Sequence, residues 1–264
     1  MLNLITPVIL TYNEAPNIDR SLIALQWAKD IVVVDSFSTD QTYEICKKYS
    51  QVRFFKREFD NHKNQWNYAI TETNIISEWI LSLDADYIIT ENLLAELSQL
   101  ETDLLTNACY ANFLYKIHGR PLAGSLYPPI AVLFRKGTCT YIQDGHTQRL
   151  QVVGKSMYLK NSIILDDRKS VSHWIIAQSK YAKLEAKKIG SLSFSQLSLP
   201  DKLRKMLFIT PWFVPIFSFF VKRAFLAGLH GMFYCFQRAA FEIMLTLYLM
   251  EDGIKKAANK YDKH

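Results

Sequence analysis

The chain has 264 residues, 49% of them apolar, which is enough for one large α/β domain with an appendage and argues against a disordered protein. Its formal charge is +6, but the segment from residue 200 onward holds ten Lys and Arg against five Asp and Glu, so residues 1–199 are nearly neutral. Residues 1–199 lack the basic stripe with interleaved aromatic residues that nucleic-acid binding needs, so we expect no nucleic-acid partner.

Cysteine usage and the N-terminus indicate a compartment. The four cysteines are widely spaced, form no CxxC pair and have no nearby His at metal-ligand spacing, so we interpret them as reduced core residues of a cytosolic protein. The N-terminal sequence MLNLITPVILTYNE lacks the basic region and cleavage site of a signal peptide. We therefore expect no export.

The first hundred residues alternate between strand and helix patterns. Apolar, β-branched runs predict strands at residues 4–11, 31–34, 52–55 and 79–83. Helical spacing of apolar residues predicts helices at residues 18–28 and 61–74, and a further helix ending near residue 49. This alternation predicts a parallel, doubly wound sheet of the α/β class.

Beyond residue 101 the pattern changes. Strand-like stretches at residues 108–117, 131–134 and 152–159 are separated by Gly and Pro, which predicts an antiparallel or mixed region. A longer helix is expected from about residue 170 to 188 and should end at Gly190. Its expected apolar face consists of Trp174, Ala177, Tyr181 and Leu184.

Three polar clusters follow predicted parallel strands directly. They are Tyr12-Asn13-Glu14, Asp35 and Asp84-Ala85-Asp86. Ligands bind at the carboxyl edge of such sheets, so the shared placement predicts one site. Alternate residues of an extended segment point the same way, so Asp84 and Asp86 can present two carboxylates to one divalent cation that bridges phosphates. The alternative is that these residues only cap the strand and begin the next loop.

Four ordered motifs carry a family resemblance. The segments TYNE, VVVDSFSTDQT, QWNYA and WILSLDAD resemble the family 2 glycosyltransferases, which adopt the GT-A fold, over about residues 4–190. The resemblance implies a nucleotide-sugar donor, UDP-sugar by default, and a divalent metal, Mn²⁺ or Mg²⁺. Asp35 would contact the base or ribose, the Tyr12 to Glu14 backbone would lie along the nucleotide, and Asp84 and Asp86 would serve ribose and metal.

The resemblance also suggests further donor-site residues. Gln65 and Asn67 match positions beside the nucleotide, or are only surface polar residues of a helix. Arg168 lies in a stretch that would close over the diphosphate, and its guanidinium fork suits phosphate oxygens. The alternative for this stretch is an N-capping Asp pair followed by a solvated basic residue.

Inverting transfer needs a carboxylate that takes the proton of the acceptor hydroxyl. The candidate is Asp144, in the polar segment QDGHTQ, although the family often has the acid in a different local sequence. His146, in the same segment, either completes the metal site or contacts the diphosphate, or it is only a hydrogen-bonding residue.

The C-terminal segment is apolar and basic. Residues 206–221 form an apolar run broken by Pro211 and Pro215, the basic pair Lys222-Arg223 follows, and residues 224–250 continue with internal charges. Neither stretch is a regular membrane span, and the aromatic density with flanking cations predicts helices lying in the membrane interface. The alternative is a helix pair packed on the catalytic domain, which would serve as a dimer interface.

The sequence thus predicts a GT-A-like, mostly parallel α/β sheet with a mixed second half and a helical appendage. The expected domains are a catalytic domain at residues 1–199, with its nucleotide half at 1–100 and its acceptor half at 101–199, and a membrane-associating segment at 200–264. The resemblance implies a hexosyltransferase-type enzyme, similar to small bacterial enzymes of lipopolysaccharide core or surface glycan synthesis. It would act on a saccharide or lipid-linked acceptor at the cytoplasmic face of the inner membrane. The rival hypotheses are transfer to polyprenyl phosphate and a silent nucleotide-sugar-binding scaffold.

Overall fold

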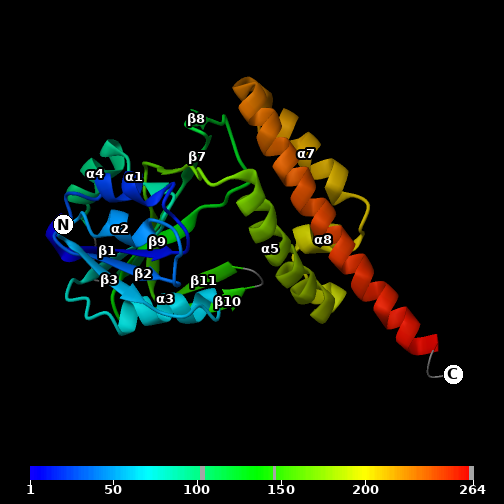
Figure 1. Cartoon of the computed structure of the whole chain (residues 1–264), viewed down its shortest axis with the longest axis horizontal. Coiled ribbons are helices and arrows are strands. Elements are labelled where there is room, and N and C mark those ends of the chain that lie inside the picture. Colours follow the sequence, from blue (N-terminus) through cyan, green and yellow to red (C-terminus); the bar gives the residue numbers. More distant parts are fainter. Residues whose placement is uncertain (102–104, 145–146, 262–264) are drawn as a thin grey trace. The chain divides into compact units, whose positions relative to one another are not determined.

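The computed structural model describes residues 1–101, 105–144 and 147–261. Its contacts divide the chain into two compact units. Unit 1 contains residues 1–119 and 127–169, and unit 2 contains residues 120–126 and 170–264 (Figure 1). The division at residue 169 lies before the boundary at residue 199 that we expected, because the first long helix packs with the C-terminal helices.

Unit 1 is built on a seven-stranded, mostly parallel sheet in the order β12-β6-β9-β4-β1-β2-β3. β1 pairs in parallel with both β2 and β4, whereas β9 runs antiparallel to β4 and β6. The α/β class and the mixed second half are thereby confirmed. The strands are β1 (Ile5–Thr11), β2 (Ile31–Asp35), β3 (Val52–Lys56), β4 (Trp79–Asp84), β6 (Thr106–Ala111), β9 (Ile130–Arg135) and β12 (Lys155–Tyr158).

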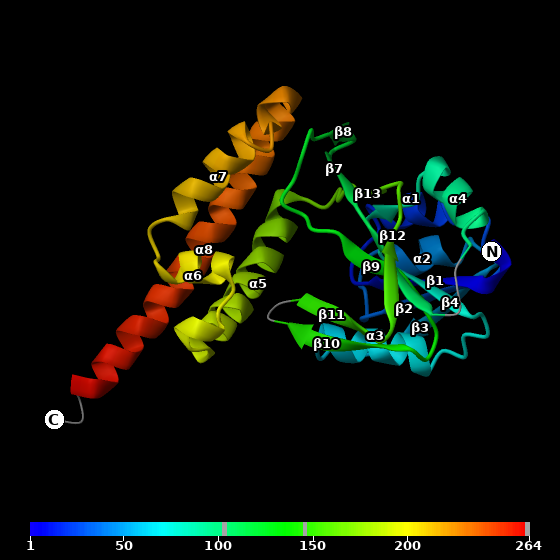
Figure 2. The same ribbon diagram turned by 180° about the vertical axis from the view of Figure 1, so that it is seen from behind.

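Helices cover both faces of this sheet (Figures 1 and 2). Ile18 of α1 (Ile18–Ile23) and Leu93 of α4 (Glu91–Ser98) pack on one face, together with α2 (Thr42–Cys46). Trp66 of α3 (His62–Thr71) packs on the other face. The central strands are buried on both sides, which explains why they are continuous runs of Val, Ile and Leu. The four cysteines are free and buried, as expected.

Two smaller sheets complete unit 1. β5 (Tyr87–Ile88) pairs antiparallel with β13 (Ile163–Leu165), which pairs in parallel with β7 (Phe113–Ile117). β10 (Cys139–Asp144) and β11 (Thr147–Val152) form an antiparallel hairpin. β5 begins directly after Asp86, so its pairing with β13 fixes the loop at the end of β4. A short 3₁₀ helix at Leu2–Leu4 precedes β1.

Unit 2 is helical. α5 (Val171–Ser191), α6 (Leu199–Lys205) and α7 (Thr210–Phe220) all pack against the long α8 (Leu229–Tyr261). Short 3₁₀ helices lie at Phe194–Gln196 and Ala224–Ala227, and β8 (Arg120–Pro121) belongs to the same unit. At its centre the Arg204 guanidinium of α6 contacts the buried Glu242 carboxylate of α8 at 2.8 Å. Among the helices within the described residues, none is long and apolar enough to cross a membrane.

The structure corrects two details of α5. Its buried residues are Ala182, Glu185, Ala186 and Ile189, whereas Leu184 of the expected apolar face is 46% exposed. The face is rotated because α5 packs with α8 through small residues, and Glu185 is neutralised by Lys188 at 3.4 Å. Gly190 does not end the helix, which runs one residue further to Ser191.

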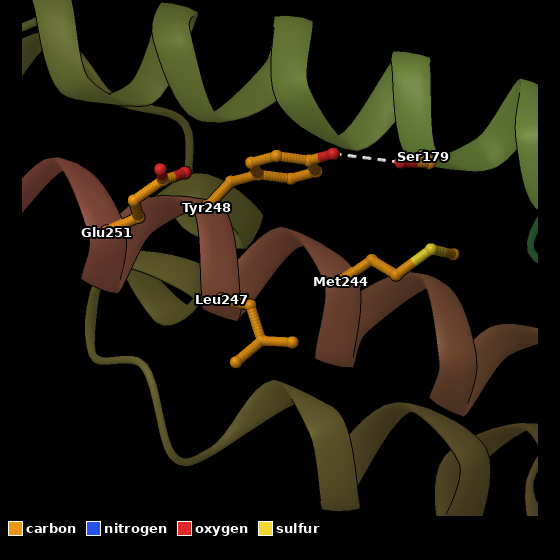
Figure 3. A pocket seen from close by; sticks show the side chains of 5 residues that line it. All are labelled: Ser179, Met244, Leu247, Tyr248 and Glu251. Atoms are coloured by element: carbon orange, nitrogen blue, oxygen red, sulfur yellow. Dashed lines mark hydrogen bonds between the residues drawn. The ribbon is translucent and has the colours of Figure 1, made fainter.

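Unit 2 also carries a hollow of about 350 Å³ on α5 and α8. Its lining is mostly apolar, and Figure 3 shows the Tyr248 hydroxyl directed at Ser179. These two hydroxyl groups hydrogen-bond at 2.8 Å and so link α8 to α5. The remaining lining residues are Met244, Leu247 and Glu251.

Candidate active site

Asp35, the last residue of β2, ties the ends of two neighbouring strands together. Its buried carboxylate accepts hydrogen bonds from the Thr11 hydroxyl at 2.9 Å, from the Ser38 amide at 2.8 Å and from the Ser38 hydroxyl at 2.5 Å. Thr11 ends β1, so the loops that follow β1 and β2 are held as one surface at the carboxyl edge of the sheet.

The loop of Tyr12, Asn13 and Glu14 is fastened to the loop after Asp35. Asn13 has the left-handed backbone that Asn tolerates better than most residues, with φ 53°. Its amide donates to the Ser38 hydroxyl at 2.7 Å, and its side-chain oxygen accepts from the Thr39 amide at 2.8 Å. The Tyr12 ring is 52% exposed beside this pair, so the loop presents one aromatic side chain to solvent.

The two predicted residues of α3 have different surroundings. Gln65 is fully buried next to the Asp35 loop, where its amide donates to the Ser36 hydroxyl at 3.2 Å and its oxygen accepts from Arg57 at 2.6 Å. Asn67 instead exchanges hydrogen bonds with the main chain of Tyr141, at 3.1 and 3.0 Å. Asn67 therefore attaches β10 to α3, whereas Gln65 supports the loop that follows Asp35.

A cluster of carboxylates lies at the end of β4. Burial raises the pKa of Asp86 well above its usual range, and the negative charges of Glu14, Asp84 and Asp167 raise it further. Burial also raises the pKa of Asp84, although the charge of His62 opposes the shift. The loop that holds them is fixed, because Ser21 donates to the Ala85 carbonyl at 2.6 Å. The structure thus brings together the acidic residues from the first and third predicted clusters.

Lys169 supplies a positive charge to this cluster. Its ammonium contacts the Glu14 carboxylate at 2.5 Å. Burial lowers the pKa of Lys169, but the charges of Glu14 and Asp167 outweigh burial and raise the pKa above its usual value. Asn17 completes the group by donating to Glu14 at 2.9 Å and to Asp167 at 2.8 Å. The sequence analysis did not identify Asn17 or Lys169, which are separated along the chain and meet only in the folded structure.

Arg168 contacts a different carboxylate. Its guanidinium grips Asp166 at 2.9 and 2.7 Å, and Arg20 reaches the same oxygen at 3.0 Å. Burial raises the pKa of Asp166, but the hydrogen bonds from Arg168 and from the Gly119 amide bring it below its usual value. Asp166 thus anchors the segment, and Lys169, rather than Arg168, is the cation that the structure sets on the acidic cluster.

Asp144 is the last residue of β10, at the end of the β10–β11 hairpin. The preceding Gln143 accepts a hydrogen bond from the amide of Lys63 at 3.5 Å, in the first turn of α3. His62, the first residue of α3, interacts electrostatically with Asp84. The start of α3 therefore lies beside both the Asp144 hairpin and the carboxylate cluster. His146 lies outside the described residues.

The cluster can be compared with what a divalent cation requires. Among the described residues, no group of three or more His, Cys, Asp and Glu side chains forms a ready-made metal site. Mg²⁺ in nucleotide sites is commonly held by only one or two carboxylates, with substrate phosphates supplying the other ligands. Asp86 and Asp84 fit that chemistry, because burial and the neighbouring negative charges raise the pKa of Asp86, and a bound cation would offset both effects.

Comparison with known proteins decides the family. Residues 6–130, which include the Tyr12, Asp35 and Asp84 clusters, match the model of glycosyl transferase family 2. These residues form a family 2 glycosyltransferase domain. An uncharacterized glycosyltransferase of Rickettsia bellii is 24% identical over 242 residues, which cover 86% of this chain and 79% of that protein.

Two solved structures show distant likenesses. S. aureus TarS, residues 1–349, in complex with UDP is 14% identical with a TM-score of 0.47, and the match covers 94% of this chain and 91% of that chain. Glucosyl-3-phosphoglycerate synthase of Mycobacterium tuberculosis, in complex with Mn²⁺, UDP and phosphoglyceric acid, is 15% identical with a TM-score of 0.46. That match covers 67% of this chain and 76% of the synthase.

Proposed function

We propose that this family 2 glycosyltransferase transfers a sugar, with inversion, from a nucleoside diphosphate sugar to a hydroxyl group of a saccharide acceptor. The observation that carries the proposal is the convergence of Glu14, Asp84, Asp86 and Lys169 at the carboxyl edge of the sheet. The loop after Asp35 is hydrogen-bonded to the loop of Tyr12, whose ring is 52% exposed, and an exposed aromatic ring suits a flat nucleoside. The family resemblance makes UDP the default nucleotide.

Asp86, with Asp84 in support, would hold a divalent cation, Mn²⁺ or Mg²⁺. When bound, the cation stabilises the negative charge of the departing diphosphate. Glu14 and Lys169 then act as a paired support, since Lys169 holds Glu14 in place and both flank the position of Asp86. Because the donor is anionic, Lys169 can also attract a phosphate oxygen.

Asp144 would act as the general base. Its carboxylate accepts the proton of the acceptor hydroxyl while the oxygen attacks the anomeric carbon, and the bond from that carbon to the diphosphate breaks. Support comes from its place at the end of the β10–β11 hairpin, next to the first turn of α3 and so on the side of Asp84. If Asp144 proves dispensable, Asp167 is the next candidate, because its negative charge acts on Asp86.

The proposed acceptor is a saccharide on lipopolysaccharide or another lipid-linked carrier, at the cytoplasmic face of a bacterial inner membrane. Two features support this assignment: the apolar, cation-flanked helices of unit 2 and the resemblance to small enzymes of surface glycan synthesis. Transfer to polyprenyl phosphate is the second candidate, for which the Lys222-Arg223 pair offers cations to a lipid phosphate.

A donor-hydrolysis assay tests the proposal. The purified full-length chain is incubated with a panel of nucleoside diphosphate sugars, with manganese or with EDTA, and released nucleotide is measured. We expect release from one donor class in manganese only. A catalytically silent nucleotide-sugar-binding scaffold would bind the same donor, raising the melting temperature, and release nothing. That result would overturn the proposed enzyme activity while leaving the binding site in place.

A further inference from the structure

The helix α7 exposes apolar side chains and buries small polar ones, which is the opposite of a helix that faces water. Its outward side chains are aromatic or aliphatic, with Trp212 74% exposed, Ile216 56% and Phe220 64%. Its small polar side chains point the other way, since Thr210 and Ser218 are buried. Trp212, Ile216 and Phe220 recur at intervals of four residues and so form one continuous stripe. Water is a poor environment for this face.

The same apolar surface continues around the turn that leads into α8. Leu229 is 77% exposed and Phe236 is 70% exposed, and they lie two helical turns apart on the first part of α8. α7 and the start of α8 pack against each other as a hairpin, joined by the 3₁₀ helix at Ala224–Ala227 (Figure 1). The hairpin is close: a Cβ atom on Gly231 would lie 1.7 Å from the Ala224 carbonyl oxygen, so only glycine fits.

The charged residues near this apolar surface indicate what binds to it. Between residues 206 and 236 there is no Asp or Glu, and the only Lys and Arg are Lys222 and Arg223, at the turn of the hairpin. A second copy of the chain seated on the same face would bring two more cations and no acidic residue from this stretch to pair with them. A bilayer that contains anionic lipid offers an apolar interior beneath a negative surface, which matches both features.

The dimensions limit how deep the hairpin can reach. α7 has 11 residues, and at a rise of about 1.5 Å per residue it is much shorter than the hydrocarbon core of about 30 Å. Arg223, which adopts a left-handed backbone with φ 55°, ends the apolar run at the turn. The geometry therefore suits a helix that lies in the interface of one leaflet.

We propose that α7, the Ala224–Ala227 turn and the first part of α8 form a monotopic docking surface for an anionic bilayer. The stripe of Trp212, Ile216 and Phe220 enters the acyl boundary, and Lys222 and Arg223 lie at the level of the lipid phosphates. The inference deepens the proposed function and rests on it for the lipid-linked acceptor. The docking itself depends on unit 2 alone.

Vesicle flotation of the full-length chain tests the docking. At low salt we expect the protein to float with vesicles of phosphatidylglycerol and phosphatidylethanolamine and to stay behind with pure phosphatidylcholine. Replacing both cations, Lys222→Gln with Arg223→Gln, should lower the partition coefficient by roughly 10- to 30-fold, the effect of two surface cations. The double variant Trp212→Ser with Phe220→Ser should abolish flotation. Ile76→Ser is the matched control, because Ile76 is an isolated, 96% exposed apolar residue of unit 1 and should not matter.

Fluorescence gives an independent readout in the unaltered protein. Insertion of Trp212 should shift the tryptophan emission to the blue, and lipids with brominated acyl chains should quench it. Trp212→Phe should keep flotation and lose most of this response. Circular dichroism with thermal unfolding shows whether each variant is folded, so a loss of flotation can be assigned to the surface.

Three outcomes would overturn the docking proposal. The first is that the wild-type protein stays in the soluble fraction at low salt with anionic lipid. The second is that the folded Trp212 and Phe220 double variant floats as well as wild type. The third is that the protein forms a stable dimer in solution that buries Trp212 and does not float. Measuring donor hydrolysis in the same samples tests the proposed catalytic function separately from the membrane docking. Loss of flotation with hydrolysis intact contradicts only the docking, and flotation without hydrolysis contradicts only the catalysis.

Discussion

The carboxylates around Asp86 lower the stability of the folded protein when no ligand is bound. The negative charges of Glu14, Asp84 and Asp167 act on the buried Asp86, and the positive charge of Lys169 opposes them. Nearby like charges oppose ionisation, and an ionised carboxylate whose pKa is raised in the folded state destabilises the fold at neutral pH. Such perturbed carboxylates occur preferentially at functional sites. The cluster is therefore adapted to receive a cation with its anionic ligand.

We predict that Asp86→Asn stabilises the substrate-free protein at pH 7 by about 1 kcal/mol, because it removes the repelled charge. The same change should remove most of the melting-temperature increase that manganese with UDP gives to wild type. Differential scanning calorimetry with and without ligand measures both effects. Asp60→Asn serves as a control of opposite sign, since the hydrogen bond from Arg57 lowers the pKa of Asp60 and its removal should destabilise. A ligand response preserved in Asp86→Asn would contradict the assignment.

For Asp144 we predict an effect on turnover and little effect on donor binding. Asp144→Asn keeps the shape of the side chain but cannot accept the acceptor proton, so kcat should fall by a factor of about 10² to 10⁴. Titration calorimetry should give an unchanged donor affinity. A variant with nearly wild-type kcat would move the role of base to Asp167.

The site could be predicted from the sequence only where its parts are local. Asp84 and Asp86 follow a buried apolar run, and Asp35 follows another, so strand ends revealed them. Lys169 and Asn17 could not be found in this way, because they reach the site only when the segment after β13 folds against α1. The residue type of Arg168 suggested a phosphate ligand, but its ion pair with Asp166 could be recognised only from the structure.

At the scale of elements, buried strands were the most predictable part. β1, β2, β3 and β4 begin and end within a residue or two of their predicted positions, because runs of Val, Ile and Leu buried on both faces are distinctive. The buried face of α5 was predicted only in part: Tyr181 packs against the α5–α8 core, but Leu184 is exposed. The fully buried apolar residues are Ala182, Ala186 and Ile189. Small residues in a helix contact give no amphipathic signal.

Glu96 on α4 provides a test of how elements are joined. Its carboxylate accepts hydrogen bonds from the Lys160 amide at 2.7 Å and from the Asn161 amide and side chain at 2.9 Å each, and so fixes the turn between β12 and β13. Burial raises the pKa of Glu96, but these hydrogen bonds outweigh burial and lower the pKa below its usual value.

Because the folded state has the lower pKa, Glu96 contributes stability above the unfolded value of about 4.3, and this contribution is lost as the pH falls through the folded value. We predict that Glu96→Gln costs about 1 to 2 kcal/mol at pH 7 and progressively less below about pH 4. Urea unfolding at several pH values measures the difference. Glu101→Gln, at an exposed position, should change stability by less than about 0.5 kcal/mol. A cost independent of pH would contradict the role of the charge.

At the scale of the whole molecule, the two units differ in what they are built to contact. Unit 1 ends its parallel strands in charged, hydrogen-bonded loops, as a polar ligand requires. Unit 2 buries an Arg204–Glu242 ion pair at its centre and exposes Trp212 and Phe220 at its surface. These opposite surfaces are expected if unit 1 binds a phosphate-bearing donor and unit 2 contacts an apolar environment. Transfer to a lipid-linked saccharide requires both.

Titration calorimetry of the wild-type chain with UDP, in manganese and in EDTA, tests the central claim most directly. The account predicts binding in manganese that weakens at least tenfold in EDTA, because two phosphates beside Asp84 and Asp86 repel these carboxylates unless a cation lies between them. Equal affinity in the two buffers, or no binding of any nucleoside diphosphate under either condition, would contradict it.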